Sequence, residues 1–212
     1  MRFETLLFDL DGTLVDSVGD LATAANALRG ELGLPPLDLG AVRAAVGDGA
    51  TALVRRVLPD PHHQPELLER FLLLYRRHML DSSALYPGIE HLLDACKGCR
   101  MAVVTNKPLP LAIELIEGLG ISERFEIVVG PECCAAKKPD PAPVLHALSA
   151  MGTGATGALM IGDHHTDLLS GRSAGVATCF CTWGIGRRDD APCDHVADSP
   201  EGLLALIRGS MP

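Results

Sequence analysis

Residues 9–17 read Asp9-Leu10-Asp11-Gly12-Thr13-Leu14-Val15-Asp16-Ser17 and follow directly on the apolar run Leu6-Leu7-Phe8. The apolar run predicts a short buried strand, and two carboxylates lie two residues apart at its carboxyl end. In open α/β sheets, ligands bind outside the carboxyl ends of the strands. Paired acids at such a place repel each other unless a cation offsets their charge. The stretch therefore indicates a hard metal and an anionic substrate, because Mg²⁺ prefers a few carboxylates together with phosphate oxygens.

Further apolar runs of strand length occur along the chain and alternate with helical patterns, at residues 101–105, 126–129, 158–161 and 177–181. This alternation predicts an α/β fold, a doubly wound, Rossmann-like parallel sheet with helices on both faces. Between residues 10 and 101 no strand pattern interrupts the chain, and apolar residues recur there at helical spacing, over 18–32, 39–46, 50–58 and 65–79. We therefore expect an inserted helical bundle at residues 16–86 and a core formed by residues 1–15 and 87–212.

The composition of the chain excludes several classes of protein. Its 212 residues are 47% hydrophobic, which is enough for a substantial core. A formal net charge of -9, with arginine pairs that are isolated along the chain, argues against a nucleic-acid partner. Because the first residues run straight into a predicted strand, we expect no signal peptide, and no apolar run approaches the length of a membrane span. The seven cysteines form no disulfide framework, so we expect reduced thiols and a cytoplasmic protein.

Polar residues also follow the other predicted strands, where a shared crevice would collect them. The segments are Val103-Val104-Thr105-Asn106-Lys107, Lys137-Lys138-Pro139-Asp140-Pro141 and Gly162-Asp163-His164-His165-Thr166-Asp167. Together with residues 9–17 they resemble, in order and spacing, the four motifs of the haloacid dehalogenase-like (HAD) superfamily of phosphohydrolases. The first of those motifs reads D-x-D-G-T-[LV]-x-D-[ST]. The resemblance covers nearly the whole predicted core.

The resemblance implies hydrolysis of a phosphomonoester through an aspartyl-phosphate. Asp9 would be the nucleophile, and Asp11 would protonate the leaving oxygen and then activate water. Mg²⁺ would be held by Asp9, by Asp11 through its backbone carbonyl, and by Asp163. Asp167, one helical turn further on, would hold the motif lysine or a metal-bound water.

The same resemblance assigns the groups that contact the phosphoryl group. Thr105 and Asn106 would supply neutral donors, and Gly12 lies in the same phosphate-binding loop. Lys138 would supply a point charge that also balances the acids; it is preferred to Lys137 because it directly precedes the proline. Thr105 and Lys138 are thus expected to be catalytic together with the two aspartates of the first motif.

Two residues of these motifs leave alternatives open. Ser17 would either cap the first helix of the insert or contact substrate. His164 stands where relatives commonly have a small polar residue. It would be an exposed residue at the start of a helix, or a group near the metal-bound water that titrates near neutral pH.

The insert matches the position and helical character of the C1-type cap, which closes over the crevice in this superfamily. Residues 46–54 are similar to the G-x-G-x-x-x-L-V segment of phosphoglycolate phosphatase-like members. Gly47 and Gly49 also suit plain helix punctuation. By this resemblance the cap would select the substrate.

We therefore expect a Mg²⁺-dependent phosphatase of a small phosphorylated metabolite, with 2-phosphoglycolate as the first substrate considered, acting as a monomer or homodimer without a membrane partner. A phosphomutase of the same superfamily shares these core residues, and sugar phosphates, nucleotides and pyrophosphate remain alternative substrates. A phospho-accepting receiver domain lacks both the helical insert and the second aspartate. A haloalkanoate dehalogenase has no use for a metal ligand at Asp163, and a non-catalytic anion binder has no use for the acid and base positions.

Overall fold

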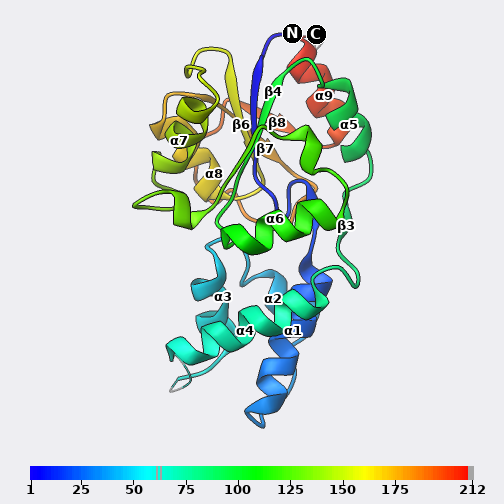
Figure 1. Cartoon of the computed structure of the whole chain (residues 1–212), viewed down its shortest axis with the longest axis vertical. Coiled ribbons are helices and arrows are strands. Elements are labelled where there is room, and N and C mark those ends of the chain that lie inside the picture. The colour runs from blue at the N-terminus through cyan, green and yellow to red at the C-terminus, as the bar shows by residue number, and fades with distance from the viewer. Residues whose placement is uncertain (61, 63, 210–212) are drawn as a thin grey trace.

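The structure, a computed structural model, describes residues 1–60, 62 and 64–209 and shows a sheet flanked by helices with a helical bundle below it (Figure 1). The sheet has six strands in the order β5-β4-β1-β6-β7-β8, and each neighbouring pair is parallel. In chain order the strands are β1 (Thr5–Phe8), β4 (Arg100–Val104), β5 (Ile127–Val129), β6 (Ala158–Gly162), β7 (Ala177–Cys181) and β8 (His195–Ala197). The predicted α/β fold with a parallel sheet is confirmed.

The central strand β1 explains why the sheet is covered on both faces. Leu6, Leu7 and Phe8 have no exposed surface, and alternate residues of a strand point to opposite faces. Leu6 and Phe8 pack into one hydrophobic cluster, and Leu7 packs into another on the opposite face. The first face is covered by α5 (Ile89–Ala95), α6 (Leu109–Gly118) and α9 (Pro200–Arg208), and the second by α7 (Ala142–Ala150) and α8 (His165–Ser173).

The insert forms its own hydrophobic cluster, built from α1 (Val18–Glu31), α2 (Leu39–Arg43), α3 (Ala50–Val57) and α4 (Pro65–His78). Within the described residues, Leu111 of α6 is the one side chain of the sheet-bearing part that is buried in this cluster. The helix predicted over residues 39–46 was too long, because α2 ends at Arg43. The following residues instead lead into Gly47 and Gly49, whose φ angles of 120° and 87° are not helical.

A short antiparallel pair joins the insert to the sheet, with β2 (Val15–Asp16) beside β3 (Ala84–Leu85). Buried Asp20 in α1 holds the returning chain, since its carboxylate accepts from the backbone N–H groups of Ser82 at 3.0 Å and Ser83 at 2.8 Å. The pair lies at the predicted boundaries after residues 15 and 86, and the division into a cap and a core stays a prediction.

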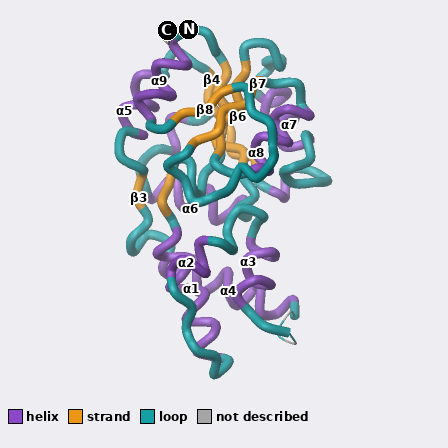
Figure 2. The backbone as a smooth tube through the Cα atoms, turned by 180° about the vertical axis from the view of Figure 1, so that it is seen from behind, coloured by secondary structure: helices purple, strands orange, loops and turns teal. Residues whose placement is uncertain are grey.

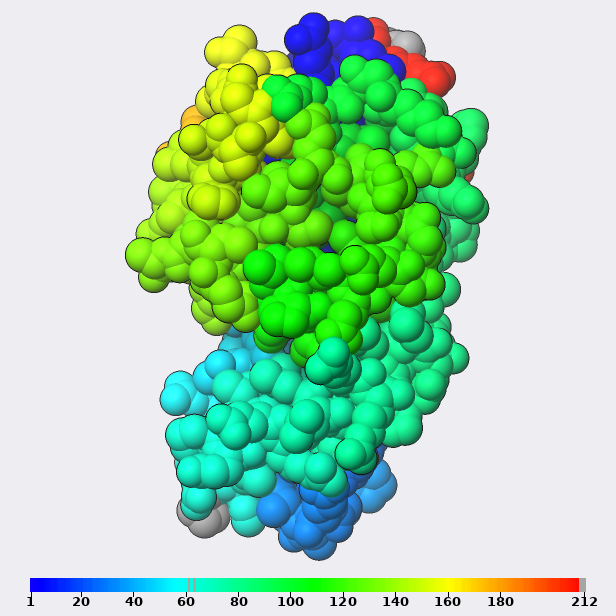
Figure 3. Space-filling view, in the orientation of Figure 1, coloured from blue at the N-terminus to red at the C-terminus, as the bar shows by residue number. Residues whose placement is uncertain are grey.

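Other elements depart little from the expected pattern. Strand β8 was not predicted, because three residues are too few to show a periodicity. Two 3-10 turns, at Ser122–Arg124 and Pro131–Cys133, flank β5. The N-terminal residues and the end of α9 lie at the end of the sheet that faces away from the insert, where the Arg2 N–H donates to the Ile207 carbonyl at 2.9 Å (Figure 2). In space-filling view a narrower waist separates the sheet and its helices from the insert (Figure 3). Of the helices described, none is long and apolar enough to cross a membrane.

Candidate active site

The carboxyl ends of β1, β4 and β6 point toward the insert, and polar residues cluster there (Figure 1). Asp9 follows β1, Thr105 follows β4 and Asp163 follows β6, and their exposed fractions are 8%, 3% and 2%. Strand pairing places these residues together because β1 lies between β4 and β6 in parallel register. Lys138 enters the same cluster from the loop between β5 and α7, and it is 1% exposed.

The ammonium group of Lys138 joins two of the buried carboxylates. Its Nζ atom donates to Asp9 Oδ1 at 2.8 Å, to Asp167 Oδ1 at 2.6 Å and to the carbonyl of Val104 at 2.6 Å. An ammonium has three donors, so all of them are engaged. A phosphate oxygen can therefore bind Lys138 Nζ only by sharing or replacing one of these partners.

The charges of this cluster do not balance. Carboxylate oxygens of Asp9, Asp163 and Asp167 lie within 4.8 Å of one another, and Lys138 is the cation bonded to two of them. Burial, reinforced by repulsion from Asp167, raises the pKa of Asp9 to about 6. Burial and the neighbouring Asp9 raise the pKa of Asp163 to about 7. Two negative charges thus remain uncompensated when all three acids ionise, which is the environment that a divalent cation stabilises.

Asp163 is oriented by its surroundings before any metal binds. Its Oδ2 atom accepts from the backbone N–H groups of Ile185 at 2.8 Å and Gly186 at 2.7 Å, and its Oδ1 atom accepts from the Thr13 hydroxyl at 3.1 Å. Gly12 has a φ of 92°, and a Cβ atom there would overlap the Asp163 carboxylate. A glycine at position 12 therefore lets Asp163 approach the first motif. This role is separate from the contact with phosphate that was predicted for Gly12.

Asp167 is held on α8 by a capping arrangement. Its Oδ2 atom accepts from the backbone N–H of His164 at 3.0 Å, while its Oδ1 atom faces Lys138. The side chain has no exposed surface. Burial alone would lower the pKa of Lys138, but Asp167 and Asp9 outweigh it and the pKa is raised. Lys138 therefore carries its positive charge throughout the physiological pH range.

A second ionic cluster surrounds Asp11, and the sequence analysis did not assign it. Lys107 Nζ donates to both carboxylate oxygens of Asp11, at 3.1 and 3.0 Å, and to Tyr75 OH at 2.7 Å. The ammonium also lies 4.3 Å from the centre of the Tyr75 ring, a cation–π distance. Ser17 Oγ donates to Asp11 Oδ1 at 2.5 Å. Lys107 is the last residue of the second motif segment, and a lysine directly after a strand-end Thr-Asn pair was the available signal.

This cluster also shows that the Ser17 side chain does not cap the first helix of the insert, while its contact with substrate stays a prediction. Ser17 occupies the residue before α1, but its side chain makes no capping hydrogen bond and instead binds Asp11. Tyr75 comes from α4 of the insert, so the Asp11 carboxylate is linked through Lys107 to the helical bundle. Burial raises the pKa of Tyr75 to about 12, so the phenol stays neutral and accepts from the Lys107 ammonium.

Thr105 and Asn106 lie at the junction of sheet and insert. Thr105 Oγ1 accepts from the backbone N–H of Lys107 at 3.1 Å. Asn106 Nδ2 donates to the carbonyls of Lys138 at 3.0 Å and Gly47 at 3.3 Å. Its Oδ1 atom is buried and has no hydrogen-bond partner among the residues that the structure describes. The Asn106 amide thus ties the loop before α3 to the loop that carries Lys138, and its predicted contact with phosphate stays a prediction.

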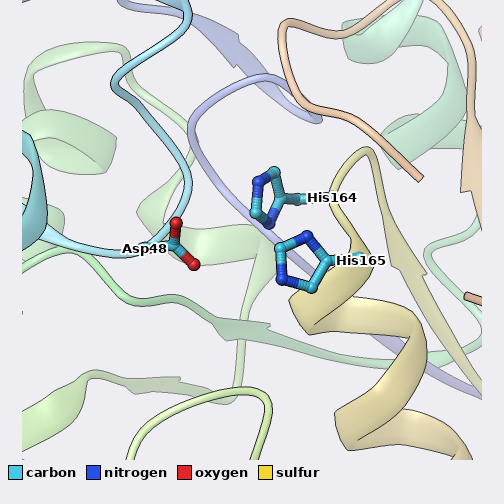
Figure 4. Close-up of side chains that lie close together, drawn as sticks. All are labelled: Asp48, His164 and His165. Atoms are coloured by element: carbon cyan, nitrogen blue, oxygen red, sulfur yellow. The ribbon is translucent and has the colours of Figure 1, made fainter. Parts of the chain in front are cut away.

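His164 differs from both interpretations given above. It is 6% exposed, so it is not an exposed residue at the start of a helix, although it does precede α8. Burial lowers its pKa to about 4, so it does not titrate near neutral pH. The buried position arises because Gly47 of the insert packs directly against the imidazole. His164 and His165 lie opposite Asp48 of the insert (Figure 4).

A small cavity of about 50 Å³ opens beside this cluster. Polar residues of the sheet-bearing part line one side, namely Asp9, Asp11, Thr105, Asn106 and Lys107. Most of the rest is lined by the insert, among others by Leu21, Leu53, Phe71, Leu72 and Tyr75, together with Pro108 and Leu111. The residues predicted for attack and proton transfer therefore share one cavity that the insert covers. This arrangement can hold a small anionic group away from bulk water.

Comparisons with known proteins agree with this geometry. The family model described as haloacid dehalogenase-like hydrolase matches residues 6–181. A phosphoglycolate phosphatase of Chromobacterium violaceum is 37% identical and aligns over 98% of this chain and 97% of its own length. An N-acetylmuramic acid 6-phosphate phosphatase of Pseudomonas aeruginosa is also 37% identical, over 98% of this chain and 96% of its own. The crystal structure of a predicted phosphoglycolate phosphatase from Haemophilus somnus superimposes with a TM-score of 0.89 at 28% identity, over 97% of this chain and 98% of the other.

Proposed function

The chain belongs to the haloacid dehalogenase-like hydrolase family and is a phosphatase, and we propose that it hydrolyses 2-phosphoglycolate through an aspartyl-phosphate formed on Asp9. The observation that carries this proposal is the buried cluster of three carboxylates around one ammonium. Asp9 is the member of that cluster that is also exposed to the covered cavity. A nucleophile, a cation site and a closed space therefore coincide at one residue.

The residues present fit Mg²⁺. The carboxylates of Asp9 and Asp163, with the main-chain carbonyl of Asp11, would hold the ion, which supplies the positive charge that lets a carboxylate approach a phosphate dianion. The raised pKa values of Asp9 and Asp163 support this assignment, because both record repulsion that a divalent cation would relieve. Lys138 and Asp167 keep the nucleophile in place from the other side.

The chemistry then divides between two aspartates. An oxygen of Asp9 forms a bond to phosphorus while the bond from phosphorus to the leaving oxygen breaks, and Asp11 gives its proton to that oxygen. Asp11 next takes a proton from water as the water oxygen attacks phosphorus, which releases inorganic phosphate and restores the Asp9 carboxylate. Asp11 Oδ1 binds both Ser17 and Lys107, whereas Oδ2 binds Lys107 alone, so Oδ2 is the oxygen with a lone pair left for proton transfer to the substrate oxygen.

The substrate assignment rests on the relatives and on the covered cavity. Phosphoglycolate and N-acetylmuramic acid 6-phosphate, the substrates in the two relatives' names, are both phosphate esters of organic acids. A phosphomutase would use the same core residues, and so would phosphatases of sugar phosphates, nucleotides or pyrophosphate. The difference lies in the insert and in how long it shields the aspartyl-phosphate from water.

The test is phosphate release from a panel of small phosphomonoesters, with Mg²⁺ and with excess chelator. We expect release that requires Mg²⁺, the highest kcat/KM for 2-phosphoglycolate, and loss of turnover in Asp9→Asn. Asp198→Asn, an exposed aspartate beside α9, is the matched control and should keep full activity. Full activity in chelator, or in Asp9→Asn, would contradict the mechanism. Isomerised sugar phosphate without free phosphate would show a mutase instead.

A further inference from the structure

Three side chains that can bind metal meet where the insert faces the start of α8. Ligand atoms of Asp48, His164 and His165 lie within 4.8 Å of one another (Figure 4). Asp48 belongs to the loop before α3 of the insert, whereas the two histidines follow β6 of the sheet. A cavity of about 420 Å³ borders all three residues, so there is space for an ion with its water ligands. The mechanism proposed above uses none of the three side chains.

The imidazole of His164 is oriented in the way that is typical of metal-binding histidines. A histidine that binds metal through one ring nitrogen almost always donates its other N–H to an oxygen, which fixes the ring. Nδ1 of His164 has such a partner, since the Thr166 hydroxyl lies 3.1 Å away. Nε2 faces the insert, because a Cβ atom on Gly47 would lie 2.6 Å from it. The second nitrogen is therefore directed toward the loop that carries Asp48.

His165 and Asp48 each have a ligand atom that the chain leaves unused. Nδ1 of His165 is buried and makes no hydrogen bond to any residue that the structure describes, although Asp189 Oδ2 lies 3.3 Å away. The Asp48 carboxylate binds Arg56 through Oδ2, so Oδ1 keeps its lone pairs. Buried polar atoms in proteins nearly always have a partner. An unused ring nitrogen close to an unused carboxylate oxygen therefore points to a ligand that accepts electron pairs.

The charges around these side chains permit a cation. Asp48 and Asp189 place two carboxylates in the lining of the cavity. Three arginines line it as well, and all are exposed, namely Arg43, Arg56 and Arg187. Water weakens the repulsion from an exposed guanidinium to about 1 kcal/mol per unit of charge at 4 Å, and a long exposed side chain can turn away. The histidines, held at the start of α8, cannot turn away in this manner.

We propose that Asp48, His164 and His165 form a site for a transition-metal ion of the Zn²⁺ class, which links the insert to the sheet-bearing part. Two imidazoles and one carboxylate suit Zn²⁺, Ni²⁺ and Cu²⁺, whereas Mg²⁺ prefers oxygen ligands alone. Two ligands of one tetrahedral Zn²⁺ lie about 3.4 Å apart, so shifts on the order of 1 Å bring the three atoms around an ion. The site is thus chemically distinct from the carboxylate cluster at Asp9.

An ion at this site opposes movement of the insert away from the sheet. Substrate and product have to pass between the two, because the insert lines most of the cavity at Asp9. Opening then requires that the ion lose either Asp48 or both histidines. We therefore expect Zn²⁺ to slow turnover without binding the substrate. This regulation goes beyond the proposed phosphatase function, and binding of the ion does not depend on that function.

Electron paramagnetic resonance of bound Cu²⁺ tests the site independently of activity. One equivalent of Cu²⁺ is added to the protein in excess Mg²⁺, and the nitrogen hyperfine structure gives the number of imidazole ligands. We expect two nitrogens in the unmodified protein and one in His165→Gln. His146→Gln, which removes an exposed histidine of α7, is the matched control and should keep two. A spectrum that His165→Gln leaves unchanged would overturn the site.

The link to the insert is tested with Zn²⁺ itself, by competition with a chromophoric chelator. Asp48→Asn and His165→Gln should each weaken Zn²⁺ binding by at least about 10-fold, since loss of even the outer partners of a metal ligand typically costs about 10- to 100-fold. Affinity that is unchanged in Asp48→Asn would show that the insert contributes no ligand and would overturn the proposal. His146→Gln should again match the unmodified protein.

Turnover separates this proposal from the phosphatase assignment. Phosphate release from p-nitrophenyl phosphate is measured in saturating Mg²⁺, with and without buffered Zn²⁺, as a ratio for each protein. Zn²⁺ should inhibit the unmodified enzyme at concentrations that leave Asp48→Asn and His165→Gln active, and a Zn²⁺-selective chelator should restore the rate. Equal inhibition of all three would place the inhibitory ion at the Mg²⁺ ligands and overturn the regulatory link. Zn²⁺ binding that needs Asp48, in a protein that hydrolyses no ester, would support the metal site and remove the proposed function.

Discussion

Replacing Asp163 by asparagine should stabilise the metal-free protein at neutral pH and remove most of its stabilisation by Mg²⁺. Asp163 is 2% exposed, and burial together with Asp9 raises its pKa from 3.8 to about 7. The amide has the shape of the carboxylate. Its oxygen can accept from the backbone N–H groups of Ile185 and Gly186, which now bind Asp163 Oδ2, and its NH₂ group can donate to the Thr13 hydroxyl.

The magnitude follows from the pKa of Asp163. Each pKa unit corresponds to about 1.4 kcal/mol, so a rise from 3.8 to about 7 sets an upper limit of roughly 4 kcal/mol on the cost of ionising this group in the folded state. The folded protein holds this proton more tightly than the unfolded chain. Its contribution to the free energy of unfolding should therefore fall as pH rises from about 4 to about 7 and then level off. We expect Asp163→Asn to gain about 1–4 kcal/mol at pH 7.5 and little at pH 4.5.

The assay is urea unfolding followed by circular dichroism at pH 4.5 and 7.5, in chelator and in Mg²⁺. The quantity compared is the difference in unfolding free energy between Asp163→Asn and the parent, because titrating groups that do not interact with Asp163 cancel in it. Asp9 does interact with Asp163, so part of the difference reflects the easier ionisation of Asp9 in the variant. Mg²⁺ should stabilise the parent by an amount that grows with its concentration above Kd, and should stabilise the variant much less. Asp198→Asn should follow the parent throughout. A variant less stable than the parent in chelator at pH 7.5 would refute the account of uncompensated charge.

Three further results are expected. Asp11→Asn should lower kcat by about 10²–10⁴-fold for alkyl phosphates and much less for aryl phosphates, which need less protonation; equal losses in single-turnover measurements would make Asp11 structural. Lys107→Met should lower kcat for alkyl phosphates more than Tyr75→Phe does, because it removes the cation that holds Asp11. Loss of the Tyr75 hydroxyl removes only one hydrogen bond to that cation, and the reverse order of the two kcat values would contradict this. Gly47→Ala should lower both stability and kcat/KM, since its Cβ would lie 2.6 Å from His164. Gly152→Ala is the control, because Gly152 also has a positive φ but lies in open space, so its thermal unfolding measures the backbone penalty alone.

The sequence was sufficient for the sheet and for the residues at its carboxyl ends. Five of the six sheet strands were predicted because each is a run of apolar residues bounded by polar ones, and parallel order then brings Asp9, Thr105 and Asp163 together. The ion pair of Lys138 with Asp167 is one of the two contacts that the resemblance to the four motifs implied for Asp167. These features depend on the local sequence pattern and on one rule of topology, that the functional residues of a parallel α/β sheet gather at the carboxyl ends of its strands.

The features that escaped prediction depend on contacts between distant segments. Tyr75 lies on a helix whose register against the sheet is set by packing, so nothing local marks its hydroxyl as the partner of Lys107. His164 is covered by Gly47 of the insert, a contact that its own sequence neighbourhood does not reveal. The two strands β2 and β3 are each two residues long and carry no periodicity. Such features become visible only once the insert and the sheet are placed together.

Among the described residues, a single side chain joins the hydrophobic cluster of the insert to the sheet-bearing part, which limits how substitutions in the insert affect the sheet. Leu111 is the described residue of the sheet-bearing part that is buried among the apolar side chains of the insert. Repacking inside the bundle is therefore transmitted to β1 and β4 mainly through polar links such as Lys107 and Asn106, and hardly through packing. Mutations that reshape the bundle away from Tyr75 and Gly47 can therefore accumulate with little effect on the carboxylates of Asp9, Asp163 and Asp167. A lineage of such proteins can thus acquire new substrates by altering the bundle alone, while the chemistry stays under separate selection.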